Sequence, residues 1–502
     1  MHNLGDILRL PAHGDRSAYI DLRNPQRVRR LTAAELDRLI GGVARGLLRR
    51  CIRRGQRVGI LSANRLEFAA SYFGIMRAGA VAVPINHRLP RSTLEHIFGD
   101  ATIQIAFCDG ERRPQVPEGA TVINFDDDGP DGFEASVDIG PLESVVPDEQ
   151  EIAEVLYTSG STGVPKGVPL SHHGQLWAIR NSLLPLGASL AEETTLIVAP
   201  LYHMNGLYFM TEALANRVTV ISQPRFEARA YLEAVARFRC TQLSGIPTMF
   251  AMMVREPIAY ELDFTSVAHI RIGSAPLTEA LLARVQRVFP HARVRNCFGT
   301  TEAGPSVFGE HPLGKATPAL SIGHSRGDVE YRLEDGPSED EGLLALRTPA
   351  MMRGYLNLPD VTAAKLREGW YLTGDRMRRD ADGFYFFAGR SDDMIVCGGE
   401  NIYPAEIETL LERHPGVSQA VVVPAPDDLK GQIPVAFVVP RDGVAPDVED
   451  IKQFALANGP AYAHPRFVVL LDFVPVSGTH KIDRSALMHE AERLSLLAGR
   501  SS

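Results

Sequence analysis

The first hundred residues alternate helical and strand-like patterns of apolar and polar side chains. Thr32 and Glu35 have the spacing of a capping box, which predicts a helix that ends near Arg50. Ser92 and Glu95 predict the start of a short helix in the same way. The other elements predicted here are a helix at 64–78 and strands at 57–61, 80–85 and 102–107. Helices that alternate with short apolar strands indicate a parallel sheet with helices on its faces.

The same alternation resumes after residue 150. Ser171 is a predicted N-cap for a helix that starts at His172. Strands are predicted at 195–199, 218–222, 241–244, 270–273 and 293–297. Together the two stretches predict two related α/β lobes within residues 1–320. The segment between them, 126–150, is acidic and contains several Gly and Pro residues, so we expect a solvated surface loop there.

The pattern changes after residue 320. Short predicted strands at 328–333, 343–347 and 384–387 are separated by Gly, Pro and Asp, and they indicate a small antiparallel barrel or sheet. Residues 389–393 interrupt this pattern before a compact α+β tail. The predicted fold is therefore of the α/β class. Residues 1–388 form a large N-terminal domain of two α/β lobes plus a small β-barrel-like region, and residues 394–502 form a small C-terminal α+β domain.

Composition and charge narrow the range of partners. The 502 residues carry a net charge of -9 and are 45% hydrophobic, which is typical of a globular protein with several domains. No basic block could follow a nucleic-acid backbone, and no apolar run reaches the ~20 residues that span a bilayer. The N-terminus lacks a signal-peptide pattern, and the five scattered cysteines favour neither zinc nor disulfides. We expect a cytoplasmic protein without nucleic-acid or integral membrane partners, and a monomer and a homodimer both stay open.

The strongest chemical signal is the stretch 156–168, which reads Leu-Tyr-Thr-Ser-Gly-Ser-Thr-Gly-Val-Pro-Lys-Gly-Val. Small residues let successive backbone N–H groups converge on a ligand, hydroxyls add donors, and Lys166 adds positive charge. This chemistry suits a polyphosphate. A Walker loop needs Gly-Lys followed by Ser or Thr, whereas Lys166 lies between Pro165 and Gly167. The other interpretation is a flexible Ser/Gly linker.

This stretch resembles the phosphate loop of the AMP-forming acyl-CoA synthetases. They belong to the adenylate-forming superfamily, which also contains luciferases and peptide-synthetase adenylation domains. Other strings resemble motifs of the same family, in family order between about residues 30 and 490. These strings are at 200–207, 273–276, 296–302, 369–375, 389–393, 397–404 and 477–484.

The resemblance implies that ATP and Mg²⁺ bind at these motifs. It makes Glu302 the Mg²⁺ ligand, residues 274–276 an adenine ledge, Thr301 a contact to the α-phosphate, and Asp375 an acceptor for the ribose diol. The implied nucleotide-binding residues are Thr158, Ser159, Gly160, Ser161, Thr162, Gly163, Lys166, Ser274, Ala275, Pro276, Asn296, Phe298, Gly299, Thr300, Thr301, Asp375, Arg390 and Lys481.

The resemblance also implies a carboxylic acid and coenzyme A as substrates. The implied catalytic residues are Lys481, Glu302 and His203, and His203 would lie between the acyl site and the thiol entry. Gly398 and Gly399 would leave room for the pantetheine arm, and Asp392 in the segment 389–393 would be the hinge about which a mobile small domain swings. The implied acyl pocket, suited to an aryl or a short- or medium-chain acyl group, contains His203, Met204, Asn205, Gly304 and Pro305.

The expected reaction has two steps. The acid attacks the α-phosphorus of ATP to give an acyl-adenylate and pyrophosphate, and the CoA thiol then displaces AMP. The alternative is an adenylation enzyme that loads a carrier-protein thiol; no carrier sequence follows residue 490, so a fused carrier is not expected. A luciferase-like oxygenase would share the fold. A non-catalytic binding protein would too, but the intact Lys481 and Glu302 disfavour it.

Some positions depart from the family pattern. Phe298 stands where Tyr is usual, which keeps a stacking ring but loses a hydroxyl. His480 replaces a usual Gly, Ala463-His464 replace a usual Tyr-Lys region, and Asp392-Asp393 replace a usual Lys-Asp pair. Two other strings imitate unrelated motifs. Residues 323–327 fit a serine-hydrolase elbow, but a strand instead of a helix is predicted after them. Residues 309–315 have Walker spacing but are followed by Ala.

Overall fold

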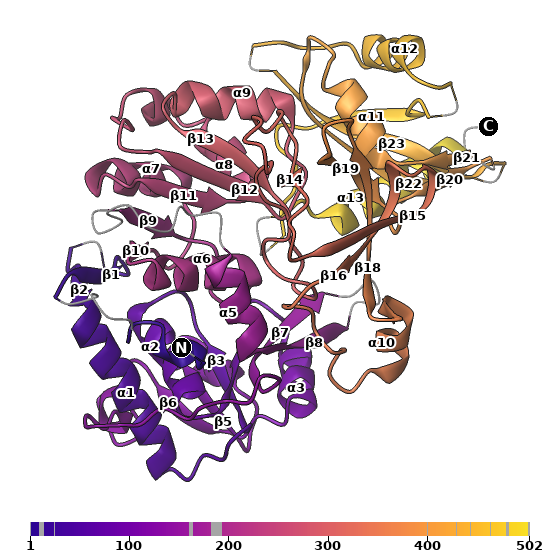
Figure 1. The fold of residues 1–502 in the computed structure, drawn as a ribbon. Helices are drawn as coiled ribbons and strands as arrows, with labels where there is room; N and C mark the ends of the chain where they lie inside the picture. The colour runs from indigo at the N-terminus through magenta and orange to yellow at the C-terminus, as the bar shows by residue number, and fades with distance from the viewer. Residues whose placement is uncertain are drawn as a thin grey trace.

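The computed structural model of the chain describes residues 2–9, 15–24, 26–159, 164–181, 193–398, 400–427, 429–441, 443–461, 463–477 and 481–499. Two α/β lobes make up most of the molecule, an antiparallel sheet adjoins them, and a small domain packs beside the second lobe (Figure 1). This architecture confirms the predicted fold class. Among the described residues, no helix has the length and apolar character needed to cross a bilayer.

The first lobe is built on a six-stranded sheet in the order β6-β5-β3-β4-β7-β8. Neighbouring strands run parallel except β7 and β8, which are antiparallel. The strands are β3 (Arg57–Leu61), β4 (Val81–Pro84), β5 (Ile105–Cys108), β6 (Thr121–Asn124), β7 (Ile152–Ser159) and β8 (Pro165–Ser171). The helices around it are η1 (Leu4–Asp6), α1 (Ala33–Arg49), α2 (Leu66–Arg77), α3 (Arg91–Asp100), η2 (Arg113–Gln115), α4 (Phe133–Ser136) and α5 (His172–Arg180). Every residue of α2 is buried, so this helix is part of the core.

Two helix starts follow the predicted capping signals. The Thr32 hydroxyl accepts a hydrogen bond from Glu35 N, and the Glu35 carboxylate accepts one from Thr32 N, which completes a capping box at the start of α1. Ser171 caps α5 by accepting a hydrogen bond from Gly174 N. Both caps satisfy N–H groups that a helix leaves unpaired in its first turn.

The capping prediction for Ser92 and Glu95 was wrong. Helix α3 begins at Arg91, its N-cap is Pro90, and no side chain caps it. Glu95 instead accepts a hydrogen bond from Arg91 Nε at 3.0 Å, one helical turn away. Since the ring of Pro90 fixes φ just before the helix, the helix starts two residues earlier than the Ser-Glu spacing suggests.

The acidic segment 126–150 is largely exposed and is mostly loop, as its composition predicts. Asp126 accepts hydrogen bonds from Arg65 at 2.9 Å and from Arg23 at 3.0 Å. The segment also contains the short helix α4, in which Phe133 is buried. Arginines from other elements therefore neutralise part of the charge of this exposed loop, and α4 anchors it to the lobe.

The second lobe is built on a seven-stranded sheet in the order β13-β12-β11-β9-β10-β1-β2. Its strands are β1 (Ser17–Asp21), β2 (Arg29–Thr32), β9 (Thr194–Ile197), β10 (Thr219–Ser222), β11 (Gln242–Gly245), β12 (His269–Gly273) and β13 (Arg293–Cys297). Its helices are α6 (Met204–Ala215), α7 (Ala228–Arg237), α8 (Pro247–Met253), η4 (Pro257–Tyr260) and α9 (Glu279–Val288). The five predicted strands are all present. The N-terminal pair β1–β2 was not predicted, and β1 runs parallel to β10 with Tyr19 opposite Val220.

The antiparallel sheet has the order β14-β19-β18-β16-β15, with β17 paired to β18. Its elements are β14 (Gly323–His324), β15 (Glu330–Ser338), β16 (Glu341–Arg347), α10 (Pro359–Lys365), β17 (Leu366–Arg367), β18 (Trp370–Arg379) and β19 (Phe384–Arg390). Strand β15, not a helix, follows Ser325, so the hydrolase-like string is not a nucleophile elbow.

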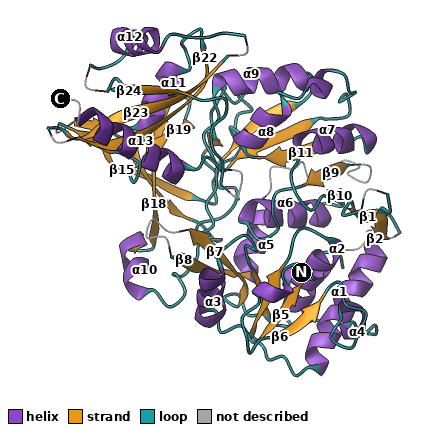
Figure 2. Cartoon of the chain, turned by 180° about the vertical axis from the view of Figure 1, so that it is seen from behind, coloured by secondary structure: helices purple, strands orange, loops and turns teal. Residues whose placement is uncertain are grey.

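The small domain has a hydrophobic core of its own, whose buried members lie between Ile395 and Ala491. Figure 2 shows β23 and β24 with α12 on one side and α13 on the other. Its elements are β20 (Ile395–Cys397), β21 (Glu400–Ile402), α11 (Pro404–Leu411), β22 (Val417–Asp427), β23 (Gly431–Pro440), α12 (Val448–Asn458), β24 (Phe467–Leu470) and α13 (Arg484–Gly499). This core is separate from the hydrophobic clusters of the two lobes.

Candidate active site

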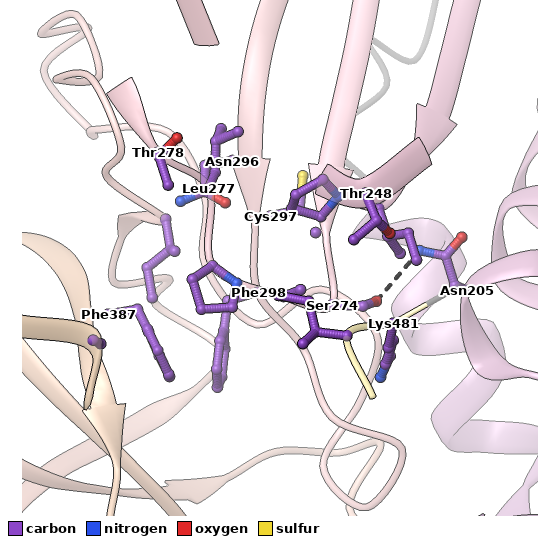
Figure 3. Close-up of a pocket in the computed structure, with 18 of the residues that line it drawn as sticks. Asn205, Thr248, Ser274, Leu277, Thr278, Asn296, Cys297, Phe298, Phe387 and Lys481 are labelled. Atoms are coloured by element: carbon purple, nitrogen blue, oxygen red, sulfur yellow. Dashed lines mark hydrogen bonds between the residues drawn. The ribbon is translucent and has the colours of Figure 1, made fainter. Parts of the chain in front are cut away.

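A cleft of about 1930 Å³ lies where the two lobes, the antiparallel sheet and the small domain meet. The chain segments that leave β11, β12 and β13 line it. Open α/β sheets bind their ligands outside the carboxyl ends of the strands, and large concave pockets are the usual binding sites. The cleft is therefore the candidate active site, and Figure 3 shows part of it.

The turn after β12 forms one wall of the cleft. A Cβ on Gly273 would come within 2.7 Å of the Cys297 carbonyl oxygen, so only glycine allows β12 and β13 to approach this closely here. Ser274 follows with a φ of 64°, a left-handed conformation that is uncommon outside glycine. Ala275, Pro276 and the neighbouring strand residue Asn296 also line the cleft. The residues predicted to contact adenine, 274–276, therefore line the cleft.

The loop after β13 is held by tight backbone contacts. Thr300 and Gly304 exchange two backbone hydrogen bonds of 2.9 Å each. A Cβ on Gly299 would come within 2.3 Å of the Pro305 carbonyl group, so this fold of the loop requires glycine. As a result the predicted residues 298–302 all line the cleft, together with Pro305.

Glu302 is held by an aromatic residue from another part of the chain. Tyr355 donates a hydrogen bond from its hydroxyl to Glu302 Oε1 at 3.0 Å. The Lys166 ammonium lies 5.5 Å from the centre of the Tyr355 ring, and all three residues line the cleft. Burial raises the pKa of Tyr355, and the Glu302 carboxylate raises it further, so the phenol stays protonated and keeps donating.

Asp375 and Arg390 form a pair whose position is set by strand register. They lie opposite each other on β18 and β19, and Arg390 Nη1 donates to Asp375 Oδ1 at 2.7 Å. Arg390 Nη2 also donates to Asp392 Oδ2 at 3.2 Å. Asp375 is only 4% exposed, and burial raises its pKa to about 6, although the Arg390 charge opposes the shift.

Lys481 reaches the cleft from the small domain (Figure 3). The Lys481 side chain lies in the open cleft, and the cleft walls surround it with protein. This loss of solvent lowers the pKa of Lys481, and the positive charge of Arg390 lowers it further. His203, the N-cap residue of α6, lines the same cleft. Burial lowers the pKa of His203 to about 3, with Lys481 adding to the shift, so the imidazole is neutral near pH 7.

Three polar side chains within residues 202–205 of the cleft have an atom without a hydrogen-bond partner in the described part of the chain. Tyr202 Oη, His203 Nε2 and Asn205 Oδ1 are buried, and none of them has a hydrogen-bond partner within the described part of the chain. The Asn205 amide nitrogen does donate to Ser274 Oγ, at 3.4 Å (Figure 3). Met204, between them in sequence, also lines the cleft.

The remaining predicted residues divide into three groups. Thr158 lines the cleft opposite Lys166 in the β7–β8 ladder. Gly304 supports the loop described above with a φ of 118° but does not line the cleft. Gly398 follows β20 directly and is not among the residues that line the cleft. Outside the described residues lie Gly160, Ser161, Thr162, Gly163 and Gly399, as does the side chain of Ser159.

Sequence reasoning missed two aromatic residues of the cleft. Tyr371 belongs to the motif string 369–375, but it was not singled out there, and it hydrogen-bonds Tyr355. Tyr355 itself follows no recognised pattern, and only the tertiary fold brings it to Glu302. In the described part of the chain no three His, Cys, Asp or Glu side chains gather as a metal cluster.

Comparisons with known proteins agree with this geometry. A model of AMP-binding enzymes matches residues 9–356, and a model of the AMP-binding enzyme C-terminal domain matches residues 406–481. A fatty acid–[acyl-carrier-protein] ligase, ScoC, from Streptomyces coeruleorubidus is 33% identical over 91% of both chains. A feruloyl-CoA synthase from an Amycolatopsis species is 32% identical over 90% of this chain and 92% of its own length.

The solved structures add information on conformation. The crystal structure of ATP-bound MatB from Rhodopseudomonas palustris is 25% identical, covers 98% of this chain and 99% of that one, and superposes with a TM-score of 0.89. The apo structure of the same protein, over the same shares of both chains, gives a TM-score of 0.79. The present conformation is thus closer to the ATP-bound form than to the apo form.

Proposed function

The chain belongs to the family of AMP-binding enzymes, and from that premise we propose that it joins a carboxylic acid to coenzyme A, using ATP and releasing AMP and pyrophosphate. The observation that carries this proposal is the meeting of Lys481, Glu302 and Asp375 in one cleft, although they come from three parts of the fold. A cation, a hard carboxylate ligand and a diol acceptor are the groups that activation of an acid by a nucleotide requires.

The first step forms a bond between the acid's oxygen and the α-phosphorus of ATP and breaks the bond to the β-phosphate, so pyrophosphate leaves. Negative charge grows on the phosphate oxygens during this displacement. Lys481 and Lys166 bring two ammonium groups to the lining of the cleft, and Thr301 brings a hydroxyl. Such preorganised groups lower the barrier because they already point at the developing charge. Asp375 would hold the ribose diol, and Phe298 with the wall at 274–276 would hold the adenine.

Glu302 fits the role of a Mg²⁺ ligand. Its carboxylate is half-buried at the cleft, and the hydrogen bond from Tyr355 engages only Oε1, which leaves the second oxygen for a cation. Mg²⁺ prefers oxygen ligands and is commonly held by one or two carboxylates together with substrate phosphates. When bound, the ion would neutralise charge on the phosphate oxygens. Tyr355 orients the carboxylate for this role.

In the second step the CoA sulfur attacks the acyl carbonyl carbon, and AMP leaves as the carbon–oxygen bond breaks. Neutral His203 lies on the cleft wall and can form a hydrogen bond without repelling the Lys481 cation. In the present arrangement Lys481 occupies the cleft, and Gly398 is not among the residues that line it. We therefore infer that the small domain rotates about the segment 389–393 between the steps, withdrawing Lys481 and bringing Gly398 to the thiol path.

The acceptor has one serious alternative. The similarity to a fatty acid–[acyl-carrier-protein] ligase over 91% of both chains favours a carrier-protein thiol as a second candidate. The similarity to a feruloyl-CoA synthase over a comparable length favours CoA and an aryl acid. The acyl pocket around His203, Met204, Asn205 and Pro305 would suit an aryl or a short- or medium-chain acyl group.

A pyrophosphate-release screen tests the proposed function. Purified enzyme is incubated with ATP, Mg²⁺ and a panel of aryl, short-chain and medium-chain acids, in parallel with CoA, with a separate holo carrier protein, and with neither thiol. We expect pyrophosphate release with a subset of acids, and AMP and acyl-CoA only when CoA is present. Acyl transfer to the carrier but not to CoA would replace the CoA proposal with the alternative. Absence of acid-dependent pyrophosphate release with every acid would contradict both.

The Asp375 carboxylate should make ATP binding pH-dependent. A carboxylate accepts both hydrogens of the ribose diol, whereas the protonated acid loses an acceptor, so lowering the pH through about 6 should weaken ATP binding. The KM for ATP should be flat above pH 7 and should rise below pH 6 by up to about tenfold per pH unit. Asp375→Asn should give a high KM that no longer depends on pH from 5 to 8. The same acid-side rise in Asp375→Asn as in the wild type would contradict the assignment.

A further inference from the structure

The small domain meets the second lobe at helix α9. Arg284, on α9, donates a hydrogen bond from Nη1 to Ser418 Oγ on β22 at 3.4 Å. Thr278, the N-cap of α9, accepts a hydrogen bond from Leu281 N, which leaves its hydroxyl hydrogen for a second partner. That partner is the carboxyl group of Glu412, the C-cap residue of α11. Two polar contacts from one helix therefore join the lobe to the small domain.

Both contacts lead to one edge of β22. This strand comes last in the order of its sheet, with β23 on one side. At its other edge, Ala420 N donates to Glu412 Oε1 at 3.2 Å, and Val422 N donates to Glu408 Oε1 at 2.9 Å. The backbone N–H groups of an edge strand need partners, and two carboxyl groups of the α11 region supply them here. Glu412 thus connects the edge of β22 to Thr278 on the second lobe.

The same edge of β22 holds the segment that carries Lys481. Arg484 lies three residues after Lys481, at the start of α13. Its Nη1 donates to the Val422 carbonyl oxygen at 2.7 Å, and its Nη2 donates to Glu408 Oε1 at 2.7 Å. The Lys481 carbonyl oxygen accepts a hydrogen bond from Ser477 N at 2.7 Å, which ties the backbone at Lys481. A connected path of hydrogen bonds and strand backbone therefore runs from α9 through β22 to Lys481.

We propose that Arg284 and Thr278 are positioning residues, which hold β22 against the second lobe and thereby keep Lys481 in the cleft during acyl-adenylate formation. This inference rests on the proposed function, because it concerns how Lys481 is presented to the nucleotide. The two contacts belong to the present arrangement of the small domain. A contact made in only one of two arrangements shifts the population toward that arrangement, so these contacts favour the first half-reaction.

The test measures both half-reactions in Arg284→Ala, Ser418→Ala and the double variant. In each, kcat/KM for acid-dependent pyrophosphate release should fall by about fivefold, the typical effect of one hydrogen bond. Thioester formation from preformed acyl-adenylate should keep its wild-type rate. The double variant should be no slower than Arg284→Ala, because the two side chains form one contact. Arg229→Ala is the matched control, since Arg229 lies on α7 and pairs with Glu233 outside the cleft.

Two further comparisons separate positioning from other roles. Thr278→Val removes the hydroxyl and should slow pyrophosphate release in the same way as Arg284→Ala, whereas Thr278→Ser keeps the hydroxyl and should restore the rate. Both Arg284→Ala and Thr278→Val are then combined with Lys481→Ala. In that background neither should slow pyrophosphate release further, because each acts through an ammonium that is already missing.

The opposite results overturn the inference. A further loss in the Lys481→Ala background would mean that Arg284 or Thr278 acts on the nucleotide directly. Equal loss of both half-reactions would mean that they support the fold of the enzyme, and unchanged pyrophosphate release would mean that the contacts do not hold the small domain. Ser418→Ala decides if Arg284→Ala does not fold. Absence of pyrophosphate release from the wild type with every acid would instead contradict the proposed function.

Discussion

Replacing Lys481 with alanine should lower the rate of acyl-adenylate formation by about 10²–10³-fold and leave thioester formation from preformed acyl-adenylate near the wild-type rate. The ammonium shares the cleft with Glu302 and Asp375, where the α-phosphate would lie, so its loss removes charge stabilisation in the first step. In the proposed second step a thiol displaces AMP after Lys481 has withdrawn. A lysine that acts only in the first step should therefore matter only there.

Two half-reaction assays separate the steps. Acid-dependent pyrophosphate release measures the first, and conversion of synthetic acyl-adenylate with CoA measures the second. Lys452→Ala is the matched control, because Lys452 also belongs to the small domain but lies on α12 beside Glu449, outside the cleft. It should leave both rates unchanged. Equal loss of both half-reactions in Lys481→Ala would refute the assigned role.

Replacing Asp392 with proline should impair the second half-reaction and spare the first, which is the reverse of the result expected for Lys481→Ala. In Asp392→Pro we expect adenylation to persist, because Lys481 already occupies the cleft in the present arrangement. Thioester formation should fall by about 10²-fold or more. The proline ring fixes φ at the pivot, so the small domain cannot rotate to the arrangement in which the thiol reaches the acyl-adenylate. The comparison uses the same two assays as for Lys481.

Asp392→Ala is the control for the side chain. It removes the carboxylate that accepts a hydrogen bond from Arg390 at 3.2 Å, but it leaves the backbone free to rotate. Both half-reactions should proceed in this variant, with at most a modest effect through Arg390. Normal thioester formation in Asp392→Pro would mean that the pivot lies elsewhere.

Local sequence signals predicted much of the fold. The capping box at Thr32 and the cap at Ser171 were confirmed because each signal is complete within four residues. The strand pair β1–β2 was missed because β1 owes its place to β10, about two hundred residues away, and no local pattern encodes that pairing. The exposed loop at 126–150 could be predicted from its composition, but the arginines that pair with Asp126 could not, because they come from distant elements.

The candidate site shows the same division. The motif strings identified Glu302, Asp375 and Lys481 as candidate site residues, and in the structure all three line one cleft. Their roles stay predictions, as do the roles of residues 160–163 and the hinge. Tyr355 could not be predicted, because its importance lies in a single contact with Glu302 across the fold. That Gly398 is not among the residues lining the cleft was also beyond the sequence, because motifs do not specify which arrangement of a small domain is populated.

The pairing of β1 with β10 also has a consequence during synthesis. Tyr19 leaves the ribosome long before Val220, its neighbour in the finished sheet. At cellular rates of translation the delay is roughly 10 to 40 seconds. For that time β1 can pair only with β2, its neighbour in the sequence, and its other edge has no partner strand until the second lobe emerges.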